Sequence, residues 1–259
     1  MLMCANRFKI SLVQSSIEWL QPEQNRVAAE EWIANYCDSE LIIFAEMFTT
    51  GFCMTPDMCV ESSNITLSWM IQMAQKYNIA IIGSVATEDG DRYYNRLYVV
   101  KSDGAYVKYD KRHLFTFAGE DENYTCGVEK LIVEIQGVRI LPIVCYDLRF
   151  PAWIRNRGDY DMMVCVANWP KSRRGAWDIL LKARAIENVS YVCGVNIVGE
   201  GDSVQYSGGT VALNYRGEVI TLVADNEVGV ATFEVDMDAL LKFRGKYPVL
   251  NDADDFELI

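Results

Sequence analysis

Two side chains with reactive chemistry follow directly after apolar stretches of this 259-residue sequence. Glu46 comes after the apolar run 41–45, and Cys145 comes after the run 140–144 and before a polar turn. A residue directly after a buried strand lies at the carboxyl edge of its sheet, where open α/β folds collect ligand sites. A strand followed by a nucleophile-type residue and then a helix exposes that side chain and offers the next backbone N–H as an oxyanion donor. The pattern therefore favours a thiol nucleophile at Cys145.

Each of these residues also has an ordinary structural interpretation. One cysteine among eight is more often an inert part of the core than a nucleophile, and a glutamate at a strand end is usually solvated. Lys111 lies in the charged run 109–113, which is typical of a surface. Taken singly, none of the three predicts catalysis.

Taken together, three segments resemble the motifs of a known family. Residues 44–52 (FAEMFTTGF), 109–115 (YDKRHLF) and 144–151 (VCYDLRFP) resemble, in order, the Glu, Lys and Cys motifs of the nitrilase, or carbon–nitrogen hydrolase, superfamily. Residues 167–170 (ANWP) and 183–188 (ARAIEN) resemble two further segments of that family. The resemblance runs from Phe8 to about Phe256, and CYDLRFP and the chain's ending are most similar to the omega-amidase branch.

The resemblance implies a mechanism that agrees with thiol chemistry. A free thiol has a pKa of about 8.5, so it needs a nearby base or cation at neutral pH. Glu46 would be the base, and the Lys111 ammonium and the backbone N–H of Tyr146 would hold the oxyanion. Protonated Glu46 would then give its proton to the leaving ammonia, and a water that it activates would release the acid from a Cys145 thioester.

A second glutamate of the family corresponds by position to Glu120. Glu122 lies only two residues away, so a single sequence leaves the choice between the two acids open. It also leaves open that the segment is an acidic surface loop without a catalytic role.

The omega-amidase resemblance also implies a substrate class, namely small dicarboxylate monoamides such as 2-oxoglutaramate. Such a substrate carries a free carboxylate, which Arg173 or Arg174 could pair with. Phe117 and Trp169 are candidates for apolar walls of the pocket. A nitrile, an N-carbamoyl compound or deaminated glutathione remains an alternative substrate.

Two other functions are compatible with the same residues. A Cys–His thiol hydrolase would use His113 as base, but the neighbouring Lys111 and Arg112 disfavour its protonation and no third orienting residue is evident. A catalytically silent binding or assembly protein on the same fold is the second alternative. The resemblance implies no metal or organic cofactor, because nucleophile, base and oxyanion donors are all protein groups, and it implies a homodimer.

Composition limits the remaining partners. The 36 acidic and 24 basic residues give a formal charge of −12, which repels nucleic acid and anionic membranes. A single histidine excludes a multi-histidine metal site, and no cysteines form a C-x-x-C pair. The start of the sequence has too little apolar length before Cys4 to be a secretory or lipoprotein signal, and no apolar run is long enough to span a membrane. We expect a cytoplasmic protein with free thiols, whose small-molecule substrate is an amide.

The residue pattern predicts the elements that must position these side chains. Apolar runs predict strands over 8–14, 41–45, 79–83, 131–136, 138–145, 162–167, 191–198 and 228–235. Helical spacing predicts helices around 29–37 and 67–74, and further helices are predicted near 152–157, 176–189 and 237–244. Hairpins are predicted over 93–109 and 206–224, and a long functional loop over 110–130.

No linker or composition break divides the chain, so we expect one domain over residues 1–259. The order of elements predicts an α/β fold, a four-layer α-β-β-α sandwich with two mixed sheets, with a doubly wound single sheet as the alternative.

Overall fold

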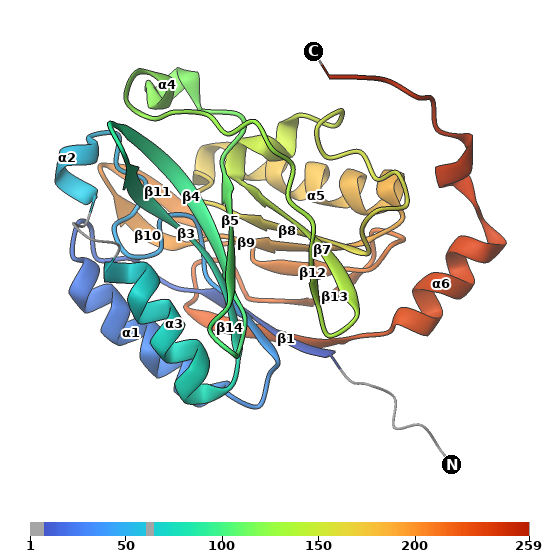
Figure 1. Cartoon of the computed structure of the whole chain (residues 1–259), viewed down its shortest axis with the longest axis horizontal. Helices are drawn as coiled ribbons and strands as arrows, with labels where there is room; N and C mark the ends of the chain where they lie inside the picture. The colour runs from blue at the N-terminus through green and yellow to red at the C-terminus, as the bar shows by residue number, and fades with distance from the viewer. Residues whose placement is uncertain (1–7, 61–64, 259) are drawn as a thin grey trace.

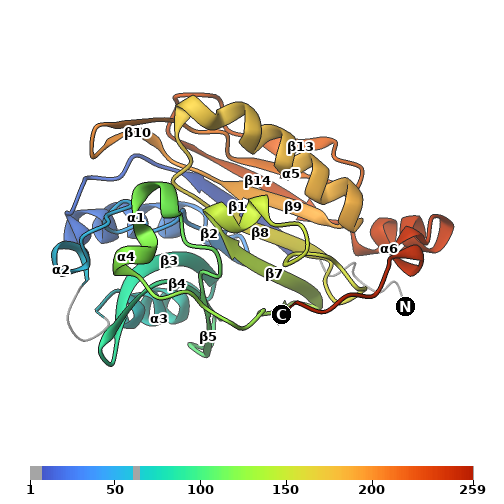
Figure 2. The same cartoon turned by 90° about the horizontal axis from the view of Figure 1, so that it is seen from above.

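The computed structural model describes residues 8–60 and 65–258. Two six-stranded sheets lie face to face with helices on their outer faces, which confirms the four-layer α-β-β-α sandwich (Figures 1 and 2). A short hairpin of two strands lies beside them. Residues 1–7, which include Cys4 and concern the expectation about a signal peptide, lie outside the described residues.

The first sheet has the strand order β14-β1-β2-β3-β4-β5. Its centre is parallel, because β1 pairs with β2 and β2 with β3 in the same direction, and β14, β4 and β5 join antiparallel. Helices α1 and α3 cover its outer face. The elements are β1 (Phe8–Gln14), α1 (Pro22–Asn35), β2 (Leu41–Ile43), α2 (Pro56–Cys59), α3 (Ile65–Tyr77), β3 (Ala80–Asp89), β4 (Arg92–Val100), β5 (Tyr106–Asp110) and β14 (Gly229–Val235).

The second sheet repeats this arrangement with the order β13-β12-β9-β8-β7-β6. Strands β7, β8 and β9 are parallel, and the outer strands join antiparallel. Helix α5 packs on its outer face. The remaining elements are α4 (Glu120–Asn123), β6 (Val133–Ile135), β7 (Val138–Val144), β8 (Met162–Val166), α5 (Arg174–Asn188), β9 (Tyr191–Val195), β10 (Val198–Gly201), β11 (Val204–Ser207), β12 (Val211–Leu213), β13 (Val219–Leu222) and α6 (Met237–Lys246), with 3₁₀ turns at Thr116–Ala118, Cys145–Arg149, Lys171–Arg173 and Val249–Asp252.

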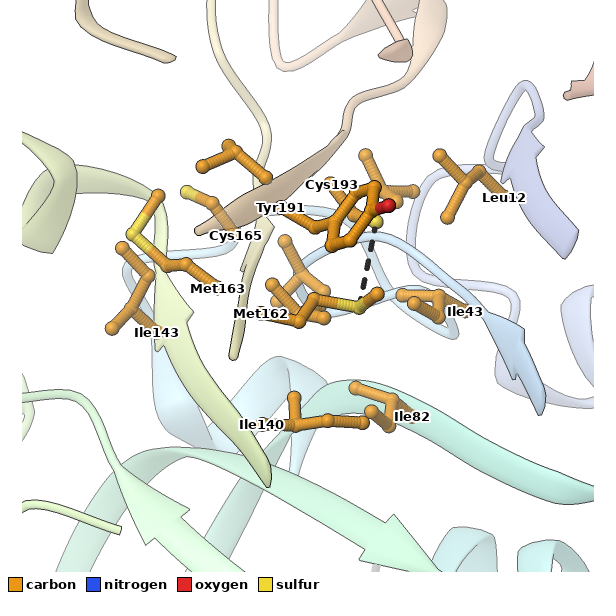
Figure 3. Close-up of a cluster of buried hydrophobic side chains, with 14 of the residues drawn as sticks. Leu12, Ile43, Ile82, Ile140, Ile143, Met162, Met163, Cys165, Tyr191 and Cys193 are labelled. Atoms are coloured by element: carbon orange, nitrogen blue, oxygen red, sulfur yellow. Dashed lines mark hydrogen bonds between the residues drawn. The ribbon is translucent and has the colours of Figure 1, made fainter. Parts of the chain in front are cut away.

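The core lies between the two sheets. Leu12 and Ile43 from the first sheet and Ile140 and Met162 from the second are fully buried in one cluster, and Figure 3 shows them facing one another. Strands buried on both faces carry near-continuous apolar runs, which is why these runs were recognisable in the sequence. The packed interface fixes the two sheets against each other and so fixes the relative positions of their edges.

One predicted helix is wrong. Residues 152–157 form a turn and an irregular segment rather than a helix. The Asn156 side-chain oxygen accepts hydrogen bonds from the backbone N–H groups of Gly158 and Asp159, at 2.9 and 3.2 Å. Asparagine offers the backbone such an alternative to helical bonding, and here the turn is the conformation adopted.

Other boundaries also differ from the predictions. The expected strand over 191–198 is divided into β9 and the start of the β10–β11 hairpin, which was not predicted because its residues are polar and glycine-rich. The expected hairpin over 206–224 is likewise divided, since β11 pairs with β10 while β12 pairs with β13. The loop over 110–130 contains a 3₁₀ turn and the four-residue helix α4.

The packing between the sheets predicts a large effect of truncating Ile140. We expect Ile140→Ala to lower the free energy of unfolding by about 2–5 kcal/mol, because it leaves a cavity between the sheets. Ile179→Ala is the control, since Ile179 is 69% exposed on α5 and the change is expected within about 0.5 kcal/mol. Urea unfolding of both variants measures the difference, and equal losses would contradict the placement of the core.

Candidate active site

The two sheets bring three strand ends to one edge. Glu46 follows β2 by three residues, Lys111 directly follows β5, and Cys145 directly follows β7. Strand β5 runs parallel to β2 and β3, because it is antiparallel to β4, which is antiparallel to β3. The carboxyl ends of these strands therefore open to the same side of the sandwich, in accordance with the general position of sites in α/β folds.

A buried ion-pair cluster lies at this edge. Lys111 Nζ is 2.9 Å from Glu46 Oε1 and lies 3.0 and 2.8 Å from the two carboxylate oxygens of Glu120. All three side chains have no exposed surface. Breaking a buried pair leaves an uncompensated charge, so such groups are expected to remain fully partnered.

Asn95 and Asn168 complete the hydrogen bonding of the cluster. Asn95 Nδ2 donates to Glu46 Oε1 at 2.8 Å and to Glu120 Oε1 at 3.1 Å. The backbone N–H of Asn168 donates to Glu46 Oε2 at 2.8 Å, and its side-chain amide donates to the Glu46 backbone carbonyl. Glu46 is thereby fixed from both sheets.

Sequence reasoning missed both asparagines as contributors. Asn168 lies in the segment 167–170 that resembles the family, which was the available signal, whereas Asn95 lies inside a strand and has no recognisable motif around it.

Electrostatics keep Lys111 charged. Burial disfavours the ammonium ion, but the charges of Glu120 and then Glu46 outweigh burial and raise the pKa of Lys111. Burial raises the pKa of Glu120, the Glu46 charge raises it further, and Lys111 opposes both. The cluster thus holds a permanent cation beside two acids, and the site offers both a charge for an oxyanion and a carboxylate for proton transfer.

Cys145 occupies a strained position between β7 and the following 3₁₀ turn. Its φ of +44° lies in the left-handed region, where a residue with a side chain is strained. Burial and the charge of Glu46 raise the pKa of its thiol well above the ordinary value, while Lys111 lowers it. At neutral pH the thiol therefore holds its proton, and it needs a base to become a nucleophile.

Cys145 lines a cavity of about 380 Å³. Of the residues proposed from the sequence to bind substrate, Phe117, Trp169 and Arg173 also line it, as does Tyr146. Trp169 is buried, whereas Phe117 is 85% exposed and so forms part of the cavity's rim.

The structure also separates the alternatives that the sequence left open. Glu120 is buried and Glu122 is exposed, so Glu120 is the acid that joins the cluster. Arg173 lines the cavity, but Arg174 pairs with Asp178 and Asp225, each at 2.8 Å, and is absent from the cavity wall.

Arg149 is a cavity residue that sequence reasoning missed. Its guanidinium carbon lies 5.0 Å from the centre of the Trp169 ring, and that of Arg173 lies 5.0 Å from the Phe115 ring. Across residues 8–60 and 65–258, neither guanidinium has a carboxylate partner. The signal in the sequence was its position four residues after Cys145, within the segment 144–151 that resembles the family's Cys motif.

His113 is not part of the cavity wall. Its Nδ1 lies 2.8 Å from Asp147 Oδ1, and its ring stacks on Phe150 with centroids 3.7 Å apart. The residue proposed as an alternative base is thus engaged elsewhere.

Comparison with known proteins identifies the family. The family model described as carbon-nitrogen hydrolase matches residues 9–244. The chain belongs to the carbon–nitrogen hydrolase family. It is 40% identical to an omega-amidase, YafV, of Escherichia coli (strain K12), over 96% of this chain and 98% of that protein. It is 30% identical to a 2-oxoglutaramate amidase of Bacillus subtilis (strain 168), over 95% and 97% of the two chains.

A solved structure agrees with this family. A CN-hydrolase superfamily protein from Xanthomonas campestris, whose active site holds an arsenic adduct, is 38% identical and superposes with a TM-score of 0.94, covering 98% of this chain and 99% of the other. The predicted nitrilase resemblance is confirmed, and with it an amide-hydrolysing enzyme of this family.

The ion-pair cluster predicts that Lys111 is needed for the stability of the fold. We expect Lys111→Met to lower the free energy of unfolding by about 3–5 kcal/mol, because Glu46 and Glu120 are left buried without a cation. Lys108→Met is the control, since this lysine is half exposed and its pair with Asp89 is worth about 0–1 kcal/mol. Urea unfolding at neutral pH measures both. A Lys111→Met loss no larger than the control's would contradict the cluster as described.

Proposed function

We propose that this protein is an omega-amidase, which hydrolyses the terminal amide of a small dicarboxylate monoamide such as 2-oxoglutaramate to 2-oxoglutarate and ammonia. The observation that carries the substrate class is the pair of guanidinium groups, Arg149 and Arg173, in the cavity that Cys145 lines. A free guanidinium binds a carboxylate in a bidentate, charge-assisted manner. The names of the 40% and 30% identical relatives support the same activity.

Acylation begins with the protonated thiol. Glu46 takes the proton of Cys145 as the sulfur attacks the amide carbon, and the C=O electron pair moves to oxygen. The Lys111 ammonium and the Tyr146 N–H hold this oxyanion, and loss of one such donor typically costs about 2.7–4 kcal/mol of barrier. Glu46 then returns the proton to the nitrogen as the C–N bond breaks, so that ammonia leaves and a Cys145 thioester remains.

Deacylation repeats these steps with water. Glu46 takes a proton from water as its oxygen attacks the thioester carbon, and the same two donors hold the second oxyanion. The C–S bond breaks, the sulfur regains the proton, and the acid is released. Glu120 acts through Lys111, which it contacts with both carboxylate oxygens, and so keeps the ammonium aimed at the reacting oxygen.

Arg149 and Arg173 would place the far end of the substrate. The two guanidinium groups would hold the carboxylate of a five-carbon substrate. The terminal amide at the other end of that substrate would then extend toward Cys145, which lines the same cavity. A neutral amide of similar length lacks this anchor. The apolar walls given by Phe117 and Trp169 then contact the methylene groups between the two ends.

The alternative with His113 as base has less support, because that ring is bonded to Asp147 and does not line the cavity. Within residues 8–60 and 65–258 no helix is long and apolar enough to cross a membrane. The homodimer, the single domain over the whole chain and the cytoplasmic location remain predictions.

Substitution of the two arginines tests the substrate class. We expect Arg173→Met and Arg149→Met each to lower kcat/KM for 2-oxoglutaramate by about 10- to 150-fold, since a hydrogen bond to a charged group is worth about 1.5–3 kcal/mol. The rate with a neutral amide of equal length, valeramide, should change by less than about threefold. Ammonia release measures both substrates.

Arg174→Met is the matched control, because Arg174 pairs with Asp178 and Asp225 outside the cavity, and we expect it to leave both rates unchanged. Equal losses on the acidic and the neutral amide in the Arg149 and Arg173 variants would contradict the carboxylate anchor. A wild-type preference for glutamine, asparagine or a simple nitrile over 2-oxoglutaramate would contradict the proposed substrate.

A further inference from the structure

Asp147 is a buried carboxylate with all of its acceptor positions in use. Its Oδ1 accepts from the backbone N–H of His113 at 2.9 Å and lies 2.8 Å from His113 Nδ1. Its Oδ2 accepts from the Tyr109 hydroxyl at 2.8 Å and from the backbone N–H of Val144 at 3.1 Å. Asp147 has no exposed surface, and in the described residues no arginine or lysine pairs with it.

The four donors come from two segments that carry reactive groups. Val144 directly precedes the strained Cys145, and Tyr109 and His113 lie two residues before and two residues after Lys111. One carboxylate therefore links the nucleophile turn (145–149), which follows β7 of the second sheet, to the lysine segment (109–113), which lies at the end of β5 in the first sheet. It also lies one residue after Tyr146, whose N–H is the other proposed oxyanion donor.

We propose that Asp147, with His113 as its partner, is a positioning residue of the reaction. It sets the distance between the Lys111 ammonium, the Tyr146 N–H and Cys145, and it holds Cys145 in its left-handed conformation. This proposal rests on the proposed amidase function. It assigns the protein's single histidine to the support of the oxyanion site instead of to proton transfer with substrate.

Further contacts make this network rigid. The His113 ring is stacked at an interplanar angle of 5° on Phe150, the residue that ends the nucleophile turn. The Tyr109 hydroxyl accepts from Trp153 Nε1 at 3.1 Å and from the backbone N–H of Arg112 at 3.3 Å while it donates to Asp147. Both side chains that bond to Asp147 are thus themselves held by a second contact.

Asparagine at position 147 would fill the same space without the same bonding. Whichever way its amide is turned, the NH₂ group faces one backbone N–H, that of His113 at the Oδ1 position or that of Val144 at the Oδ2 position. The tyrosine and histidine side chains can change from donor to acceptor, but a backbone N–H cannot. The substitution therefore moves either the lysine segment or the residue before Cys145.

The kinetic effect should appear in kcat. A displacement of about 1 Å between reacting groups can cost about 100-fold in rate. We expect Asp147→Asn to lower kcat for ammonia release by about 10- to 100-fold, with KM within about threefold of wild type, because the arginines that hold the substrate are untouched.

Asp161→Asn is the matched control for stability. Asp161 is also a buried carboxylate, bonded to Arg139 and Arg244, but it precedes β8 at the edge of the sheet opposite to Cys145. We expect it to lower the melting temperature while kcat stays within about twofold. A purely structural role of Asp147 predicts that Asp147→Asn behaves in the same way, with a lower melting temperature and an unchanged kcat, and this result would overturn the proposal.

His113 provides a second pair of variants, which keeps the proposal testable if Asp147→Asn does not fold. Asparagine can place its NH₂ group near the position of His113 Nδ1, so His113→Asn should keep kcat within about threefold. His113→Ala removes that donor and should lower kcat by about 5- to 20-fold. Equal, complete loss in both variants would assign His113 as the base, and full activity in His113→Ala would remove it from the network.

A wild-type protein that releases ammonia from no amide would contradict the proposed function itself. Normal wild-type turnover together with unchanged kcat in Asp147→Asn would contradict only the positioning role. The two failures are therefore distinguishable.

Discussion

The burial of one ammonium ion between two carboxylates is the constraint on which the rest of this structure depends. Lys111, Glu46 and Glu120 have no exposed surface, and each would be costly to bury alone. The surrounding chain has to provide a hydrogen-bond partner for each group, and these partners come from strands of both sheets. The position of Asn95 on β4 and of Asn168 after β8 follows from this requirement.

The same constraint explains how the site can transfer protons. The raised pKa of Lys111 keeps it charged, so the thiol of Cys145 and the neighbouring acids are the groups available for proton transfer in the proposed reaction. The thiol holds its proton at rest, because burial and the charge of Glu46 raise its pKa. Attack then requires a base that the cluster already orients. Cys145, with its left-handed backbone, and the next residue, Tyr146, both line the cavity.

Much of this architecture could be predicted from the sequence, and the reasons for success and failure are physical. Strands such as β7 and β8 are buried on both faces and are recognisable from unbroken apolar runs, so the residues that follow them could be placed at a sheet edge. Asn95 could not be found in this way, because it is a polar residue inside β4 whose partners are brought to it by the tertiary structure alone. Arg149 was missed because the neighbouring sequence does not show which arginines lack a carboxylate partner in the folded protein. The helix expected over 152–157 was wrong because a side-chain bond from Asn156 competes with the helix.

In the proposed mechanism Cys145 forms a covalent acyl intermediate, which intact-mass spectrometry can detect. Enzyme in excess over 2-oxoglutaramate is quenched with acid within the first turnover, and peptide mapping locates any added mass. We expect the mass of the substrate's acyl group on Cys145 in the wild type, no adduct and no ammonia release in Cys145→Ala, and much slower adduct formation in Glu46→Gln. Ammonia release retained by Cys145→Ala, or an acyl group carried by a different residue such as Cys165, would contradict this mechanism.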